Sequence, residues 1–189
     1  MLRELAEKTR TYRRFKQNEP IPVDVLHGLV DTARLTASGA NLQPLKYMVS
    51  NSPERNALIF PQLAWAGYLH DWNGPAEGER PAAYIIILGD NDIRDHFDCD
   101  AGIAAQTICL AAAEQGIGAC MLGSIKRPKL RAALDIPERF ELVLVIALGV
   151  PAEQVVLEET GESGSIEYYR DAAGAHHVPK RPLREVLLQ

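Results

Sequence analysis

A short cationic segment near the start of the chain, Arg10-Thr11-Tyr12-Arg13-Arg14-Phe15, carries side chains that bind phosphate groups. A guanidinium pairs with phosphate oxygens through two N–H donors, and a threonine hydroxyl adds another donor. In a turn or a loose helix Arg10 and Arg13 would share a face, whereas in an extended strand they would not. The alternative is a solvated run of charges beside a helix end, and the segment considered alone favours that alternative.

A second segment, Ser38-Gly39-Ala40-Asn41-Leu42-Gln43-Pro44, reads as a turn of small residues with two side-chain amides. Gly39 permits close approach to the backbone, and the amides of Asn41 and Gln43 each offer a donor and an acceptor. The pyrimidine edge of a flavin alternates donors and acceptors, so these amides suit it, although an ordinary helix end followed by a turn is the alternative. Together the two segments predict a phosphorylated cofactor with a heteroaromatic ring, and flavin mononucleotide (FMN) fits best.

Weaker candidates lie further along the chain. Gln106 is a polar residue in an apolar stretch, where a buried amide needs partners, and a core amide bonded to backbone explains it equally well. The backbone at Leu122-Gly123 could approach a ring, or simply join a helix to a strand. Lys180-Arg181 could complete the phosphate site, or belong to a solvated tail.

No dinucleotide loop, metal site or acid–base pair is predicted. The glycines of residues 116–123 are wrongly spaced for a dinucleotide fingerprint and follow a helix instead of a strand. His176 and His177 are adjacent, so in a strand they point to opposite faces and cannot share a metal. The three cysteines are odd in number and lack zinc-ligand spacing, which indicates reduced thiols. We therefore expect no catalytic side chain.

The pattern of apolar residues predicts the elements that must position these side chains. Helices are expected over residues 2–9, 23–37, 53–60, 98–115 and 128–134, and strands over 47–49, 82–88, 119–122 and 141–148. The helix over 98–115 is apolar on more than one face, so we expect it to be central and buried. Residues 61–81 are punctuated by Gly and Pro and carry the aromatic residues of a candidate substrate lid, Trp65, Tyr68 and Trp72.

Composition limits the class of protein. The chain has 189 residues, 47% of them hydrophobic, so a single domain with a real core is expected. A net charge of −5 argues against a nucleic-acid partner. No apolar run reaches the length of a membrane span, and the first residues lack the apolar core of a signal peptide, so a cytoplasmic protein is expected. Residues 152–189 are polar and resemble an arm that packs on a second subunit.

In the order of its motifs the chain resembles the nitroreductase family of FMN-dependent oxidoreductases. The resemblance rests on residues 9–15, 37–44, 100–102 with Gln106, 116–123, 148–151 and 180–183. It implies an α+β fold with a mixed sheet flanked by helices, over a single domain of residues 1–189. It also implies a homodimer that exchanges C-terminal arms, residues 151–189, and holds two FMN sites at its interface.

The resemblance also implies the cofactor ligands. The phosphate and ribityl chain would be held by Arg10, Thr11, Arg13, Lys180 and Arg181. The ring would meet, from the partner subunit, the turn residues Ser38, Gly39, Asn41 and Gln43. Gln106 would contact the cofactor from the long helix, and the backbone of Leu122 and Gly123 would lie near the reactive flavin nitrogen. Thr9, Ala37 and Leu45 depart from the family pattern, where Arg, Pro and Trp are usual.

The implied reaction is hydride transfer from NADH or NADPH, through the flavin, to a small-molecule acceptor such as a nitroaromatic or a quinone, in a ping-pong scheme. Three alternatives remain open. The first is a relative that dehalogenates reductively or consumes its own flavin. The second is a flavin-binding sensor or storage protein without turnover, and the third is a structural dimer without cofactor.

Overall fold

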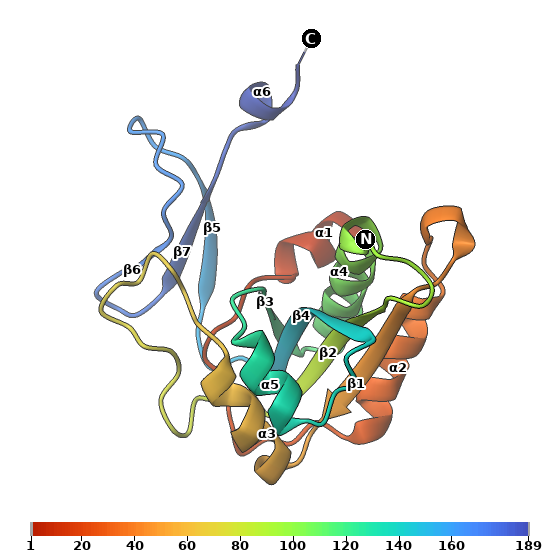
Figure 1. Cartoon of the computed structure of the whole chain (residues 1–189). Helices are drawn as coiled ribbons and strands as arrows, with labels where there is room; N and C mark the ends of the chain where they lie inside the picture. The colour runs from red at the N-terminus through yellow and green to blue at the C-terminus, as the bar shows by residue number, and fades with distance from the viewer. Residues whose placement is uncertain (1, 189) are drawn as a thin grey trace.

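Two long antiparallel strands, β2 (Ala83–Asp90) and β4 (Phe140–Gly149), form the centre of the molecule. The computed structural model describes residues 2–188, and its main sheet has the strand order β1-β2-β4-β3 (Figure 1). The outer strands are β1 (Leu45–Ser50) and β3 (Gly118–Leu122). Every residue of β2 is buried, because its run of β-branched and aliphatic side chains is covered on both faces.

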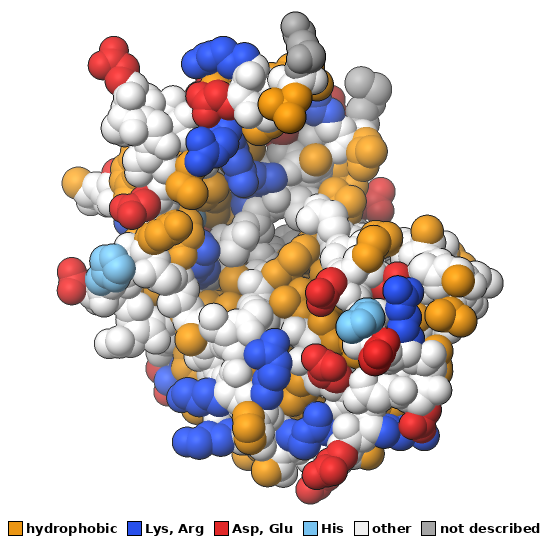
Figure 2. Space-filling model, turned by 45° about the horizontal axis from the view of Figure 1, so that its top comes forward, with side chains coloured by type: hydrophobic (Ala, Val, Ile, Leu, Met, Phe, Trp, Pro, Cys, Tyr) orange, Lys and Arg blue, Asp and Glu red, His pale blue; other side chains and the backbone are white. Residues whose placement is uncertain are grey.

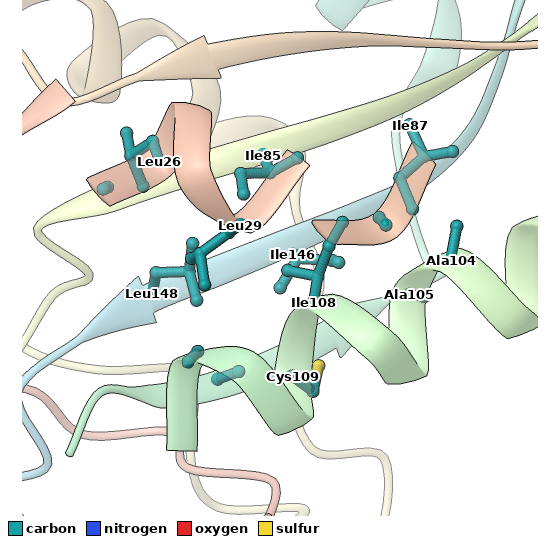
Figure 3. Packing of buried hydrophobic residues seen from close by; sticks show 14 of the residues in the cluster. Leu26, Leu29, Ile85, Ile87, Ala104, Ala105, Ile108, Cys109, Ile146 and Leu148 are labelled. Carbon is teal, nitrogen blue, oxygen red and sulfur yellow. The ribbon is translucent and has the colours of Figure 1, made fainter. Parts of the chain in front are cut away.

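Helices cover both faces of this sheet. Side chains alternate along β2, so Ile85 faces one layer and Tyr84 the other. The first layer contains α2 (Val23–Arg34) and α4 (Asp98–Glu114), from which Leu29 and Ile108 meet the sheet (Figure 3). The second layer contains α3 (Pro53–Ile59), η2 (Phe60–Gln62) and α5 (Arg127–Ala133). The first helix, α1 (Leu2–Lys8), packs on α4.

A second, smaller sheet rises away from this body (Figure 1). Its strands are β5 (Val155–Glu159), β6 (Tyr169–Arg170) and β7 (His176–Lys180), in the order β5-β7-β6. The chain then ends in α6 (Leu183–Val186). The apolar side chains at this end are exposed, from 54% for Leu187 to 94% for Leu188. Covering an exposed apolar surface of this kind with another protein surface is energetically favourable.

The expected elements are present, with ends that differ by a few residues. The α+β class is confirmed, but the expected mixed main sheet is wrong, because all its pairings are antiparallel. A parallel pairing of strands occurs instead between β5 and β7. Of the helices in residues 2–188, none combines the length and the apolar character that a membrane crossing requires.

Helix α4 was expected to be central and buried, and the structure buries only part of its surface. One face carries Ala105 and Ile108 into the core, whereas Gly102 and Gln106 are exposed on the opposite face. The exposed face of α4 could not be recognised from the sequence, because alanine and isoleucine occur all around the helix and alanine is common both in cores and at surfaces. Because Gln106 is exposed, it is not a core amide, and it does not need the hydrogen-bond partners that a buried amide requires.

Candidate cofactor site

The cationic N-terminal segment runs extended beside the first residues of β3. Thr11 forms a bridge with Ala119, and the backbone N–H of Tyr12 donates to the carbonyl of Ala119 at 3.0 Å. Further along, the N–H of Lys16 donates to the carbonyl of Val150 at 2.8 Å. Because the segment is extended, Arg10 and Arg13 are not aligned on one face.

Arg10 is placed to bind an anion. Its guanidinium donates to the carbonyl of Ala6 at the end of α1, and its Nε is buried without a hydrogen-bond partner. Burial lowers the pKa of Arg10, and the charges of Tyr12 and Glu7 oppose this shift. A partly buried cation is stabilised when an anion binds to its nitrogens. The unpartnered nitrogen of Arg10 therefore fits an anion such as a phosphate group.

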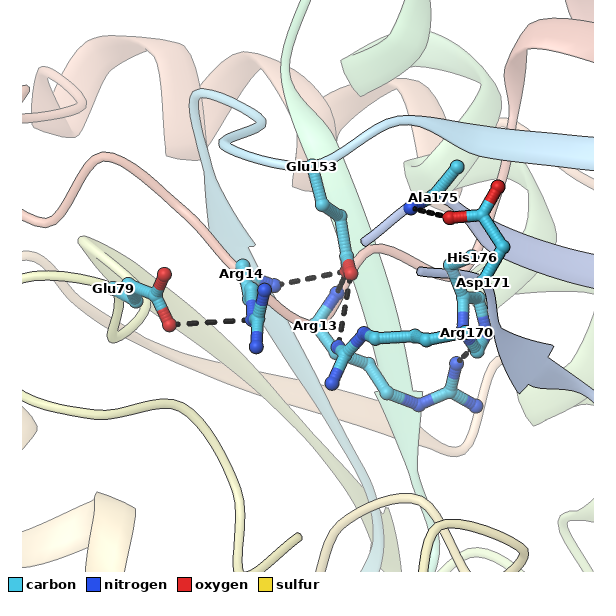
Figure 4. A network of polar contacts seen from close by, with 8 residues as sticks. All are labelled: Arg13, Arg14, Glu79, Glu153, Arg170, Asp171, Ala175 and His176. Carbon is cyan, nitrogen blue, oxygen red and sulfur yellow. Dashed lines mark hydrogen bonds and ion pairs between the residues drawn. The ribbon is translucent and has the colours of Figure 1, made fainter. Parts of the chain in front are cut away.

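Arg13 instead faces the C-terminal sheet (Figure 4). It is only 8% exposed, its Nη1 lies 2.8 Å from Nε2 of His176, and its guanidinium carbon lies 4.4 Å from the ring centre of Tyr168. The sequence did not indicate this pairing, because the partner histidine lies far along the chain. Arg13 is thus held by side chains of the C-terminal part of the chain, whereas the guanidinium of Arg10 donates to the nearby carbonyl of Ala6 and, within residues 2–188, keeps an unpartnered Nε.

Glu153, which follows β4, is the centre of the same network (Figure 4). One carboxylate oxygen accepts from the backbone N–H groups of Arg13 and Arg14, and the other accepts from Nη2 of Arg170 at 3.0 Å. The side chain of Glu153 is 1% exposed. It therefore ties the N-terminal segment to the C-terminal sheet, a role that sequence reasoning missed.

The two histidines have opposite electrostatics. Burial, and then the charge of Arg13, lower the pKa of His176 to about 4, so its ring is neutral. Hydrogen bonds that the ring of His177 donates to the carboxylates of Glu158 and Asp171 raise the pKa of His177. The rings have separate partners, and within the described residues no three His, Cys, Asp or Glu side chains gather as a metal site requires.

The predicted ring-binding turn lies between α2 and β1 and contains the short helix η1 (Gly39–Asn41). Asn41 and Gln43 are exposed, as a ligand contact would need. The hydroxyl of Ser38 is different, because it donates to the carboxylate of Asp100 at 2.6 Å. Asp100 was part of the motif on α4, but sequence reasoning gave it no separate role.

The cationic segment and the turn occupy opposite corners of the main sheet. Thr11 lies beside Ala119, which pairs with Leu148, whereas the turn leads into Leu45, which lies level with Glu141. Ala119 and Leu45 are separated by seven residues along the strands and by three strand spacings, roughly 23 Å and 14 Å respectively. The cationic segment lies one strand spacing further out, beside β3. One chain therefore does not bring both parts of the predicted site together.

The remaining candidates lie between or beyond these corners. Gln106 is midway along α4, and Leu122 and Gly123 are at the far end of β3, where Leu122 is buried and Gly123 exposed. Lys180 is the last residue of β7 and Arg181 follows it, and both are exposed on the sheet that rises away from the body (Figure 1). Figure 2 shows Lys and Arg side chains beside a hollow on this end of the molecule.

The three aromatic residues of the candidate lid do not act as one group. Trp65 packs against Phe60, with ring centres 5.9 Å apart. Tyr68 meets Tyr168 at 4.9 Å, and Trp72 lies 4.4 Å from the guanidinium carbon of Arg170. Two of the three therefore contact the C-terminal sheet, and the third contacts the body.

Comparison with known proteins decides the family. The model of the nitroreductase family matches residues 6–150, which include the N-terminal segment, the turn and all four strands of the main sheet. The chain belongs to the nitroreductase family. Membership places it among oxidoreductases and confirms the resemblance carried by its motifs.

Two relatives of similar identity to this chain carry names for different activities. An iodotyrosine deiodinase of Nematostella vectensis is 25% identical over 174 residues, covering 78% of this chain and 66% of that protein. The Bacillus subtilis protein YodC, which carries the name of an NAD(P)H nitroreductase, is 24% identical over 167 residues, covering 72% of this chain and 83% of that protein.

Solved structures of other nitroreductases share the fold. A family member from Streptococcus pneumoniae superposes with a TM-score of 0.72 at 19% identity, covering all of both chains. A Desulfovibrio desulfuricans protein, described as a nitroreductase in complex with FMN, superposes with a TM-score of 0.70 at 24% identity, covering 100% of this chain and 95% of that one.

Proposed function

We propose that this nitroreductase is an FMN-dependent oxidoreductase that takes hydride from NADH or NADPH and reduces a nitroaromatic, a quinone or a similar acceptor. The observation that carries the proposal is the buried, unpartnered Nε of Arg10 in the cationic segment. The FMN complex of the Desulfovibrio desulfuricans protein supports the choice of cofactor. When bound, the flavin supplies the redox chemistry by accepting and returning a hydride in a ping-pong scheme.

The residues of this chain bind and orient the cofactor. Arg10 and Thr11 hold the phosphate, joined by Lys180 and Arg181, and within residues 2–188 Lys180 forms no ion pair. The exposed amides of Asn41 and Gln43 meet the ring edge, with Gln106 and the backbone of Gly123 beside it. Arg13 contributes by holding the C-terminal sheet in place, since its guanidinium already contacts His176.

The working unit in this proposal is a homodimer of single-domain chains in which residues 151–189 reach across the partner. Two observations support it. The candidate ligands lie at opposite corners of one sheet, so two chains are needed to assemble one site. The end of the arm exposes Leu183, Val186, Leu187 and Leu188, which a second subunit would cover.

A second candidate function is reductive dehalogenation, because two relatives carry the name iodotyrosine deiodinase. The two functions share the cofactor and differ in the acceptor. A panel with a nitroaromatic, a quinone and an iodotyrosine separates them, with release of iodide as the signature of the second.

The purified protein tests the proposal directly. We expect a yellow protein that releases FMN, and no FAD, on heating and chromatography. NADH or NADPH should bleach the flavin colour without oxygen, and an acceptor should restore it. A yellow protein that neither reductant bleaches would be a sensor or storage protein, and a colourless protein that does not take up FMN would contradict the proposal.

A further inference from the structure

The turn over residues 38–43 has a strained backbone. Ala40, Asn41 and Gln43 have φ angles of +50°, +55° and +52°. Residues with a Cβ rarely adopt this left-handed region, and asparagine tolerates it better than alanine or glutamine. Such a backbone persists only where neighbouring groups hold it in place.

The carboxylate of Asp100, in the first turn of α4, holds both ends of the turn. Oδ2 accepts from the hydroxyl of Ser38 at 2.6 Å, and Oδ1 accepts from the N–H of Gly39 at 3.0 Å. The oxygen of the same hydroxyl accepts from the N–H of Gln43 at 2.9 Å. Asp100 therefore reaches residue 39 directly and residue 43 through Ser38.

The surroundings of Asp100 keep it charged. Its side chain is buried, with 6% of the residue exposed, and the bonds from Ser38 and Gly39, followed by the charge of Arg94, hold its pKa below the ordinary value. A Cβ on Gly39 would lie 2.5 Å from Nη1 of Arg94. The absence of a side chain at Gly39 thus leaves room for the end of the Arg94 side chain.

We propose that Asp100 is a positioning residue of the cofactor site, which fixes the exposed amides of Asn41 and Gln43 in the orientation that the flavin ring requires. The inference rests on the proposed function. These two side chains are at the surface, so core packing does not orient them, and their direction follows from the backbone. A further bond within the turn, from Nε2 of Gln43 to the carbonyl of Asn41 at 3.1 Å, depends on the same backbone.

Asp100→Asn tests the inference, with Asp98→Asn as the matched control. Both changes remove one negative charge from the first turn of α4, but Asp98 is exposed. In Asp100→Asn the new amide NH₂ opposes the donor of Ser38 or of Gly39, so one bond is lost. We expect the Kd for FMN to rise at least about tenfold in Asp100→Asn and to stay within about twofold in Asp98→Asn, as one lost bond of 1.4 kcal/mol implies.

Hydrogen exchange of the protein without FMN gives a second, independent readout. The N–H groups of Gly39 and Gln43 should exchange at least about tenfold faster in Asp100→Asn and at the wild-type rate in Asp98→Asn. Equal exchange in both variants would overturn the claim that Asp100 holds the turn. Faster exchange with unchanged FMN affinity would overturn its role in the site.

Ser38→Ala extends the test and covers the case in which Asp100→Asn does not fold. It removes the link to Gln43 but keeps the Asp100 charge, so it should also raise the Kd for FMN. If Asp100 acts through Ser38, the variant with both Asp100→Asn and Ser38→Ala should bind FMN no more weakly than the weaker-binding single variant. If the two residues acted independently, their fold-increases in Kd would multiply. A wild-type protein that binds no FMN would refute the proposed function, while the exchange experiment would still decide whether Asp100 holds the turn.

Discussion

Nη1 of Arg13 lies 2.8 Å from Nε2 of His176, although 163 positions separate the two residues in the chain. Because arginine only donates, Nε2 of the histidine accepts, and the ring proton is on Nδ1. Tyr168 closes over the guanidinium at 4.4 Å. This contact joins the N-terminal segment, which carries the phosphate candidate Arg10, to the sheet that leads to Lys180 and Arg181.

Stability should therefore fall in mild acid. Burial, and then Arg13, lower the pKa of His176 from 6.5 to about 4, while Arg170 and His177 act in the same direction and Glu153 opposes them. Between these values the unfolded chain binds a proton that the folded chain does not, so the contribution of His176 declines as pH falls from 6.5 toward 4. The slope is at most about 1.4 kcal/mol per pH unit. Urea unfolding at several pH values measures it.

His176→Gln is the control for this pH dependence. Its amide oxygen can accept the same bond from Arg13 but does not titrate in this range. The difference in unfolding free energy between wild type and His176→Gln should shrink as pH falls. A difference that is constant from pH 7 to pH 4.5 would contradict the lowered pKa of His176.

Glu153→Gln should loosen the C-terminal sheet. The substitution turns an amide NH₂ toward a donor and leaves the cation of Arg170 without its negatively charged partner. Removal of one member of a buried ion pair costs about 3 kcal/mol, and we expect a loss of stability of this size. Trp72 lies against Arg170, so its fluorescence should report the change. The exposed Glu159→Gln on β5 is the control, and equal stability of the two variants would remove Glu153 from this role.

Loss of Arg10 and Arg181 together should weaken FMN binding more than folding. Charge-assisted bonds to a phosphate contribute roughly 1.5–3 kcal/mol each, so Arg10→Ala with Arg181→Ala should raise the Kd for FMN at least about a hundredfold. Titration followed by flavin fluorescence measures it. The pair Arg3→Ala with Arg184→Ala makes the same change in charge at exposed positions and should leave the Kd unchanged. Full FMN occupancy in the first double variant would assign Arg10 and Arg181 to the solvated surface.

Removal of the C-terminal arm should abolish the dimer and FMN binding together. A chain truncated after Pro151 loses both the apolar end of the arm and the pair Lys180-Arg181. In the full-length chain, Leu187→Asp with Leu188→Asp keeps the basic pair but places charges on the exposed apolar end. We expect monomers in sedimentation and reduced flavin absorbance for both proteins. A monomer that keeps stoichiometric FMN would show that the arm serves neither purpose.

Local patterns in the sequence determined most of the elements. The β-branched run over 82–88 predicted a buried strand because both faces of such a run favour a core, and the apolar spacing over 23–37 predicted α2. The ordered motifs determined the family, since their order is a property of the chain itself. The mixed main sheet was an implication of the resemblance, and the apolar pattern could not correct it, because whether two strands pair parallel or antiparallel depends on segments far apart in the chain.

The partners of the charged residues were decided only by the tertiary structure. From sequence, Arg10 and Arg13 are equal members of one basic segment; folding leaves Arg10 with an unpartnered nitrogen and encloses Arg13 against His176. Likewise Ser38 and Gly39 read as ligand contacts, and folding brings them to Asp100 and Arg94. The physical reason is that periodicity and propensity act over a few residues, whereas burial and ion pairing depend on which distant segments the fold places side by side.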